Sequence, residues 1–495
     1  MKNPKYLLRL LQILTGITII AIIAMIFGLF GGKAEKNNFY GQEKLRATAT
    51  KIKRPRLAKN STYKELIENG DKSFYLKNLD DALFSYQKAS ELEPREALPY
   101  EKIGDIYFLQ KNYASAKENF NLALSIDPEK SGLNIKIVRA LFGQRKILDA
   151  QAALEKITKP TQQSMFYQGI LAAFLNKQEQ AKELLGEAKE MGPDENVKSG
   201  SQKILNIYRD FELEKDGKIE HLQTFLAQAF DQLGEYGLAI ELAFDALKTK
   251  NDYRDAWIVL GHAFLNEQKM FDAQDSFTKA INLDSNHPSA FFYRGIARKN
   301  LKKTEEATAD LKETLKLGFK PQIIAKFELA ENLFELKRFS EAFTLYKDVV
   351  MTDPSDITRF IRPIALAINH LNQPQQALEL AEKAFLSHSN TAMAYNLSGW
   401  AYIAMKDFAK ARQNLEQALK LDSKLAAAHL NLGQLEQAQN NNAEAIKHYE
   451  KAVLFAENSE DFLNVGVWNT AKAKIEALQK NEPQTEKIMP SLTLE

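Results

Sequence analysis

Small and apolar residues recur with a fixed period along most of the chain. One alanine position returns at steps of 34 or 35 residues, apart from one step of 31 and one of 58. These alanines are Ala82, Ala116, Ala150, Ala181, Ala239, Ala273, Ala307, Ala342, Ala377, Ala411 and Ala445. A period of this length indicates a stacked array in which each unit is one supersecondary element.

Other residues keep phase with these alanines. Glycine stands twelve residues before the alanine in seven units, and a large apolar or aromatic residue stands four residues after it in most units. A second small residue follows at seven residues, and Pro94, Pro128, Pro193 and Pro354 follow at twelve. Offsets of this kind are those of α-helices, and proline ends a helix because it has no amide hydrogen. Each unit is therefore predicted to be a helical hairpin, in which the small residues let the two helices approach closely.

The pattern resembles that of the tetratricopeptide repeat family. Two units carry it almost complete, with Tyr100, Ile103, Gly104, Tyr107, Ala116, Phe120, Ala123 and Pro128 in one, and Trp257, Leu260, Gly261, Phe264, Ala273, Phe277 and Ala280 in the other. About eleven units run from residue 63 to 459, and one of them departs from the pattern with Val138 in the glycine place. The resemblance implies an all-α, right-handed superhelical solenoid.

The long step of 58 residues predicts a break in the array. Residues 196–219 contain Ile204, Leu205, Tyr208 and Phe211, which fit one amphipathic helix, after a stretch at 198–201 that we expect to be flexible. We expect a first stack at 63–195 and a second stack at 220–459. A capping helix is expected at 460–480, because a terminal hairpin otherwise leaves its stacking face in water. A loose tail is expected at 481–495.

The segment 10–32 has no charged residue and is rich in isoleucine and leucine. As a helix it would span roughly 34 Å, enough for the ~30 Å core of a bilayer. A cleaved signal peptide is the alternative, but it has a shorter apolar core and a small-residue cleavage site, which this segment lacks. We expect an uncleaved, single-pass transmembrane anchor. Ala24, Gly28 and Gly32 share one face of it and are candidates for packing against a second copy in a homodimer.

Charge is distributed unevenly around this segment. Residues 1–9 carry three basic side chains and no acid, and 33–62 form a basic linker of charge +7, so the total of +2 leaves about −8 for the array and tail. The basic N-terminal segment favours an extracytoplasmic array, whereas the basic linker favours the cytoplasmic face. That linker would bind anionic lipid or serve as a solvated spacer. An acidic array argues against a nucleic-acid partner.

No feature of the sequence indicates catalysis. The 495 residues include no cysteine, which excludes disulfides, zinc–thiolate sites and iron–sulfur clusters. Phosphate-binding glycine motifs and histidine pairs at metal-binding spacing are also missing. We expect no catalytic residue, no cofactor and no metal site.

The family resemblance implies that the second, fifth, ninth and twelfth places of each unit, which fall on its first helix, line a concave groove for a peptide or protein segment. The resulting candidates are Phe166, Ile170, Ala173, Ile258, His262, Leu265, Phe292, Ile296, Phe327, Phe334 and Trp400. The alternative is that several of them are buried between neighbouring repeats. The matching places of the first units hold Asp71, Glu101 and Asp105, and these acids would repel a carboxylate-bearing partner tail.

We therefore expect a membrane-anchored, non-enzymatic scaffold or adaptor that mediates protein–protein interactions in the assembly of a membrane-associated complex. The alternative is a receptor or chaperone-like protein that binds one amphipathic or extended client segment in its groove.

Overall fold

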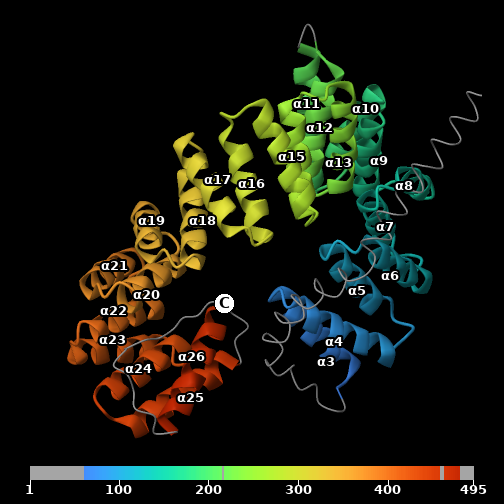
Figure 1. Ribbon diagram of the computed structural model, residues 1–495. Coiled ribbons are helices and arrows are strands. Elements are labelled where there is room, and N and C mark those ends of the chain that lie inside the picture. Colours follow the sequence, from blue (N-terminus) through green and yellow to red (C-terminus); the bar gives the residue numbers. More distant parts are fainter. Residues whose placement is uncertain (1–60, 214–216, 458–461, 480–495) are drawn as a thin grey trace, which may run out of the picture. The chain divides into compact units, whose positions relative to one another are not determined.

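The structure is a computed structural model that describes residues 61–213, 217–457 and 462–479. Within these residues it contains 24 α-helices, one short 3₁₀ helix and no strand. Apart from α11 and α26, the helices pair into eleven hairpins that follow one another along the chain (Figure 1). The expected all-α solenoid of helical hairpins is confirmed. Its right-handed sense remains a prediction.

The first four hairpins precede an extra helix, and seven hairpins and a final helix follow it. The first four hairpins are α3 (Tyr63–Tyr75) and α4 (Leu79–Leu92), α5 (Ala97–Leu109) and α6 (Tyr113–Ile126), α7 (Gly132–Gly143) and α8 (Ile147–Glu155), α9 (Gln162–Phe174) and α10 (Gln178–Met191). Next come α11 (Glu195–Leu213), α12 (Ile219–Gln232) and α13 (Tyr236–Thr249), α14 (Arg254–Asn266) and α15 (Met270–Leu283), α16 (Pro288–Asn300) and α17 (Thr304–Lys316). The remainder are α18 (Gln322–Glu335) and α19 (Phe339–Thr352), η1 (Ile357–Phe360), α20 (Ile361–Asn369) and α21 (Pro374–Ser387), α22 (Ala392–Ala404) and α23 (Phe408–Leu421), α24 (Ala426–Ala438) and α25 (Asn442–Glu457), and α26 (Phe462–Gln479).

In seven of the eleven hairpins, a glycine of the first helix lies directly against a large residue of the second. A Cβ atom added to Gly104 would lie 2.5 Å from the Phe120 ring, and one added to Gly70 would lie 2.4 Å from the Tyr86 ring. Any side chain at these glycines would therefore push the helices apart. The marker alanines, such as Ala82, are fully buried between the helices. The periodic positions in the sequence are thus the points of closest approach between helices.

Three residues separate the two helices in ten of the eleven hairpins, and four separate them in the α20–α21 hairpin. One residue in each turn has a positive φ, and it is a glycine only in the α12–α13 turn. In the α16–α17 turn this residue is Lys302, with φ 61°, and the next amide, that of Lys303, donates to the carbonyl of Arg298 at 2.9 Å. This left-handed helix end favours glycine, because other residues meet a steric cost there.

The extra helix α11 continues the packing between the two stacks. It contacts α9, α10 and α12, with Ile204 and Tyr208 fully buried, and both stacks belong to one compact unit. The expectation of a flexible stretch at 198–201 is wrong, because these residues lie inside α11. Gly200 is present for close packing, since a Cβ there would lie 2.7 Å from the Phe166 ring.

The last helix, α26, packs against α25 and α24. Val467 and Ala471 are buried in a cluster with α24 and α25, and Trp468, Ile475 and Leu478 pack against that cluster. The helix thus covers the apolar face that the last hairpin would expose to water.

The two stacks also touch directly, at a contact that we call the junction. Arg139 of α7 donates from Nε to Glu235 Oε1 at 2.7 Å, and the hydroxyl of Tyr113 donates to Glu267. Glu235 and Glu267 are both buried. The ammonium of Lys111 lies 4.2 Å from the centre of the Tyr236 ring. The turns α12–α13 and α14–α15 of the second stack therefore pack onto α6 and α7 of the first.

Two backbone segments come into contact at the centre of the junction. A Cβ added to Gly237 would lie 2.0 Å from the carbonyl oxygen of Phe142 and 3.2 Å from the Cα of Gly143. Both are main-chain atoms, so no side-chain rotation can make room. Gly237 is consequently the residue that permits this approach.

We expected a single-pass membrane protein with an extracytoplasmic or a cytoplasmic array. The structure does not support this localisation. Over 61–213, 217–457 and 462–479, every helix is too short or too polar to cross a bilayer. The longest of them, α11, has 19 residues and carries charges along its length, including Lys198, Lys203 and Arg209. The segment 10–32 with Ala24, Gly28 and Gly32 lies outside the described residues, as do 1–9, most of 33–62 and the tail 481–495.

The turn geometry generates a first prediction. Replacing the exposed Lys302 with glycine should raise the denaturant midpoint, stabilising the fold by about 1 kcal/mol, because glycine adopts positive φ without steric cost. Lys312→Gly, in the middle of α17 of the same hairpin, should lower the midpoint by a similar amount, about 1 kcal/mol. Urea denaturation followed by circular dichroism measures both, and a lower midpoint for Lys302→Gly would contradict the assignment of strain to this turn.

The junction generates a second prediction. Gly237→Ala should lower the denaturant midpoint, by an overpacking cost of about 1–3 kcal/mol, and should increase hydrogen exchange at residues 142–146 and 233–237. Gly186→Ala in α10 is the matched control, because no atom lies within 4 Å of the added methyl group. It should be neutral or stabilise by up to about 1 kcal/mol. Equal stability of the two variants would show that the main-chain contact at Gly237 is not formed.

Candidate protein-binding surface

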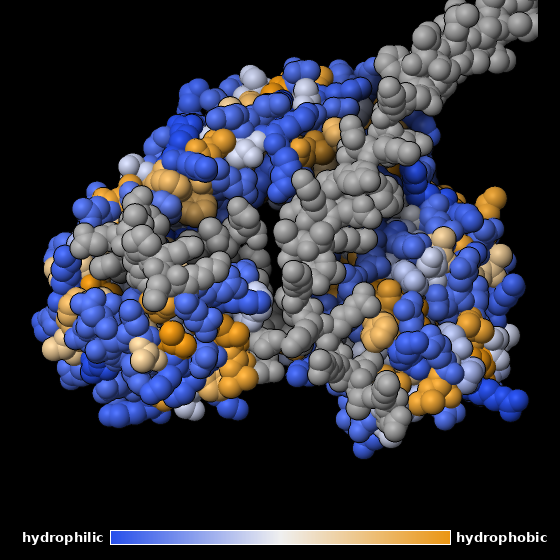
Figure 2. Space-filling view, turned by 60° about the horizontal axis from the view of Figure 1, so that its bottom comes forward, coloured by the Kyte–Doolittle hydropathy of each residue, from blue (hydrophilic) through white to orange (hydrophobic). Residues whose placement is uncertain are grey.

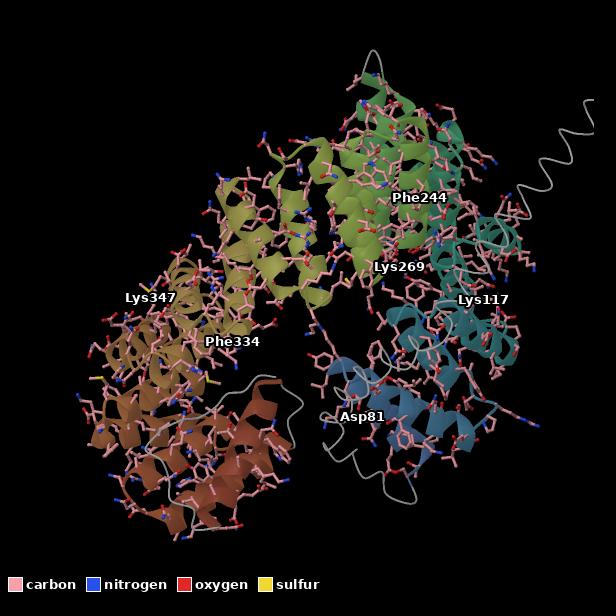
Figure 3. All side chains as sticks on the ribbon, viewed as in Figure 1. Asp81, Lys117, Phe244, Lys269, Phe334 and Lys347 are labelled. Atoms are coloured by element: carbon pink, nitrogen blue, oxygen red, sulfur yellow. The ribbon has the colours of Figure 1, made fainter. Side chains whose placement is uncertain are left out.

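The first helices of successive hairpins line a common surface, which we call the first-helix face. Neighbouring first helices contact one another, as α12 does with α14, α14 with α16, α16 with α18 and α22 with α24. Figure 3 shows Phe334 of α18 and Lys347 of α19 on opposite sides of the same hairpin. The first-helix face is therefore the surface on which the groove candidates of the sequence should lie.

The structure divides these candidates into two groups. Four are buried between helices and offer almost no surface to a partner: Phe166, Ile170, Phe292 and Trp400. Five are only half-buried: Ile258, His262, Ile296, Phe327 and Phe334. The binding role of the second group remains a prediction.

Phe292 was predicted to line the groove, but neighbouring aromatic side chains bury it in the core. Its ring stacks on Phe319 with 4.6 Å between centroids, and Tyr293 meets it edge-on at 5.2 Å. Phe319 belongs to the connection after α17, which the repeat pattern does not describe. That connection provides the neighbour that buries Phe292.

Phe334 sits in a mixed aromatic and charged cluster. The guanidinium of Arg362 lies 4.6 Å from the centre of the Phe334 ring, and its Nε lies 3.2 Å from Glu331 Oε1. The Tyr346 hydroxyl also donates to Glu331 Oε1. Burial raises the pKa of Tyr346, and the Glu331 carboxylate raises that pKa further. The cluster holds the Phe334 ring in place on α18 while leaving it half-exposed.

His262 is held by polar partners rather than by packing alone. Its Nδ1 lies 2.6 Å from Asp231 Oδ2, and Asn266 Nδ2 donates to Asp231 Oδ1 at 3.0 Å. Tyr293 approaches the imidazole edge-on at 4.9 Å. In the part of the chain that the structure describes, no three His, Asp or Glu residues are grouped to hold a metal ion.

The acidic residues on the first-helix face of the first stack are paired with lysines. Lys102 lies 2.8 Å from Asp71, and Lys136 lies 2.8 Å from Glu101 and 2.7 Å from Asp105. Burial raises the pKa of Glu101, but hydrogen bonds and charge from Lys130 and Lys136 outweigh it and lower the pKa overall.

The junction covers the next part of the same face. The ninth and twelfth places of the third unit hold Arg139 and Phe142 of α7. Arg139 pairs with Glu235 of the α12–α13 turn, and the carbonyl oxygen of Phe142 faces Gly237 at the start of α13. The Tyr167 hydroxyl of α9 donates to Glu235 at 3.2 Å. No periodic position in the sequence points to these contacts, which join residues about 70 to 150 positions apart. The one available signal was Gly237, which occupies a place where no other unit has glycine.

Beyond Phe334, helices α22 and α24 carry buried polar side chains. Asn431 Nδ2 donates to Asn396 Oδ1 at 2.9 Å, which joins the two helices. One turn further along, Trp400 and Gln434 occupy the ninth places of α22 and α24. Sequence reasoning selected Trp400 for its aromatic ring and missed the three amides, because an Asn or Gln within a helix gives no periodic signal.

Exposed apolar side chains elsewhere are scattered. Leu148, Phe271 and Leu386 are strongly exposed, and each lies on a second helix. The face of the molecule in Figure 2 shows hydrophobic residues as small patches among hydrophilic ones. Isolated apolar residues of this kind are normal on protein surfaces and indicate no further site.

Comparison with known proteins agrees with the hairpin architecture. Family models described as tetratricopeptide repeat match residues 99–130, 374–424 and 426–459. Superkiller complex protein 3 of Homo sapiens is 20% identical over 437 residues, covering 76% of this chain and 28% of that protein. The mitochondrial import receptor subunit TOM70 of Homo sapiens is 23% identical over 241 residues, covering 46% of this chain and 38% of that protein. The chain thus spans well under half the length of these relatives.

Two further similarities were found. The crystal structure of yeast Tom70 aligns with 84% of this chain and 96% of its own at 19% identity, with a TM-score of 0.29. Protein O-mannosyl-transferase TMTC3 of Homo sapiens is 26% identical over 226 residues, covering 42% of this chain and 24% of that protein. From the matched models and the hairpin fold together, the units at 99–130, 374–424 and 426–459 are tetratricopeptide repeats.

Proposed function

We propose that this protein is a tetratricopeptide repeat adaptor that holds partner proteins on the first-helix face of its second stack. The observation that carries the proposal is the row of half-buried apolar side chains on adjacent first helices, Ile258 on α14, Ile296 on α16, and Phe327 and Phe334 on α18. Burying such side chains under a partner contributes about 25 cal/mol for each Å² removed from water.

The first stack lacks an equivalent row over the helices that the junction and the ion pairs occupy. Lys102 and Lys136 neutralise the acids of α3 and α5, and the α12–α13 turn covers α7. A partner would have to displace those internal contacts before it could bind there. This contrast supports partner binding at α14, α16 and α18.

A receptor for one client segment is the second candidate. It is favoured by the arrangement of the same four side chains, which lie on three consecutive first helices and would all contact a single amphipathic segment. The similarity to an import receptor subunit is in keeping with this candidate. In both candidates the chain has no catalytic role of its own.

Charge introduced into the row tests the proposal. Ile258→Asp and Ile296→Asp should each reduce the yield of cross-linked partner proteins at least tenfold, because a carboxylate would have to be buried without a counter-charge. The measurement is quantitative mass spectrometry of proteins cross-linked to the full-length chain in its native cells. Leu386→Asp is the control, since Leu386 is 79% exposed on the second helix α21.

The outcomes separate the candidates. Unchanged partner yields with both isoleucine variants, or equal loss with Leu386→Asp, would refute binding at α14–α18. An adaptor retains several folded partners at once, whereas a receptor loses all of them when a single amphipathic peptide is added as competitor.

A further inference from the structure

A buried carboxylate on α12 holds a partly exposed histidine on α14. Asp231, in the last turn of α12, is 6% exposed, and its Oδ2 lies 2.6 Å from Nδ1 of His262. Asn266 donates to the other carboxylate oxygen at 3.0 Å. The side chain of His262 is 34% exposed, so the histidine is the outer member of this group. We call Asp231 and His262 the acid–imidazole pair.

The acid–imidazole pair belongs to the same part of the chain as the apolar row. His262 follows Ile258 by four residues, so the two side chains lie on the same side of α14. Ile296 occupies the place of His262 in the next unit, 34 residues later, and α14 contacts α16. His262 is therefore a polar residue among the apolar residues that we propose to bind partners.

The negative charge of Asp231 lacks a lysine or arginine partner. Among the described residues, its one ion-pair contact is with His262, whereas the buried Glu235 nearby is paired with Arg139. The position of Asp231 in the last turn of α12 is also unfavourable for an acid, because the C-terminal end of a helix carries a partial negative charge. A carboxylate buried without a cation is costly, so a positive charge supplied by a partner would be stabilised here.

Two neighbouring tyrosines experience the same negative charge. Burial raises the pKa of Tyr293, and the Asp231 carboxylate raises that pKa further. Burial also raises the pKa of Tyr236, and three carboxylates, with that of Asp231 first among them, raise it further. The negative potential of Asp231 therefore extends beyond its two hydrogen-bond partners.

His262 offers a hydrogen-bond acceptor next to this charge. A carboxylate only accepts hydrogen bonds, so the hydrogen between the two groups belongs to Nδ1 of His262. In the neutral ring, Nε2 is then left with a lone pair. Because Nδ1 faces the buried Asp231, the exposed part of the side chain includes the opposite edge of the ring, where Nε2 lies. An ammonium or guanidinium N–H can donate to Nε2 while Asp231 attracts its charge.

We propose that the acid–imidazole pair selects partner segments that carry a lysine or arginine between apolar residues. The cation donates to Nε2 of His262, and the apolar residues beside it contact Ile258 and Ile296. This inference rests on the proposed function, because it names the chemistry of the partner that binds to the same row. Asp231 acts as a positioning residue, since it orients the imidazole and supplies the charge behind it.

The chain's own basic linker, residues 33–62, is the alternative occupant. Its charge of +7 exceeds the single negative charge of the acid–imidazole pair. Binding the linker would place several cations against apolar side chains, each with a desolvation cost and without a counter-charge. A partner segment with one cation among apolar residues fits the site better.

The experiment uses the full-length chain and a set of fluorescein-labelled amphipathic peptides of about 15 residues, because shorter helices are marginal in water. Leu, Ile, Val and Phe are varied on one helix face, and Gln and Ala fill the other. The central position of the apolar face is Lys in one version of each peptide and its uncharged analogue norleucine in the other. Fluorescence anisotropy gives the Kd of each version, and residues 33–62 are added as an unlabelled competitor.

Three variants of the chain separate charge from packing. Asp231→Asn keeps the shape of the side chain and removes its charge, and His262→Phe keeps a ring and removes Nε2. Asp245→Asn is the matched control, because it makes the same substitution on α13 of the same hairpin, where Asp245 is already bound to Lys248 at 2.8 Å.

The unaltered chain should bind the best Lys peptide about tenfold more tightly than its norleucine version, because charge-assisted hydrogen bonds are the strong ones. Asp231→Asn and His262→Phe should each remove this preference, and Asp245→Asn should keep it. A purely structural disturbance would weaken both versions of the peptide equally, so the ratio of the two Kd values isolates the effect of the charge.

Four results would overturn the inference. The two versions could bind equally to the unaltered chain, the preference for Lys could survive Asp231→Asn, or none of the peptides could bind. Residues 33–62 could also displace the best Lys peptide at a lower concentration than that peptide itself, which would assign the site to the chain's own linker. Capture of cellular partners through Ile258 and Ile296 is measured separately, so loss of the Lys preference leaves the adaptor proposal standing.

Discussion

The close contact between a glycine on one helix and a large ring on the next sets the geometry from which the rest of this structure follows. At Gly104 and Phe120, or Gly433 and Tyr449, the two helices touch where any added carbon would overlap the ring. That contact fixes how far apart and at what angle the two helices lie. Repeated from hairpin to hairpin, it brings first helix beside first helix and thereby creates a continuous face on which a partner can be held.

Two kinds of surface result from the same repeated geometry. In the first stack, the charged groups on this face are paired within the protein. Lysines neutralise Asp71, Glu101 and Asp105, and Arg139 pairs with Glu235 at the junction. In the second stack, Ile258, Ile296, Phe327 and Phe334 on the first helices are apolar and only half-buried. The difference comes from a few substitutions at equivalent places and not from a change of fold.

The periodic part of the structure could be predicted from the sequence, because every marker position has a local physical cause. Gly104 and Ala116 recur since each hairpin repeats the same close contact. The non-periodic part could not be predicted in this way. Gly200 lies in a stretch that we expected to be flexible, and Gly237 lies outside the periodic positions, yet Gly200 permits close packing against Phe166 and Gly237 against Phe142. Likewise, Phe292 occupies a groove place but is buried by Phe319, which lies in a connection outside the repeat pattern.

The junction also changes how the protein would respond to mechanical load. A stacked array normally transmits tension through every unit in turn, because each repeat contacts only its neighbours. Here the bond from Tyr113 to Glu267 closes a loop of about 150 residues, and Arg139 and Glu235 close a shorter one inside it. Tension applied beyond the two ends of that loop would pass from α6 to α14 directly. The repeats between them would bear little load until the junction broke, and would then add their contour length in one step.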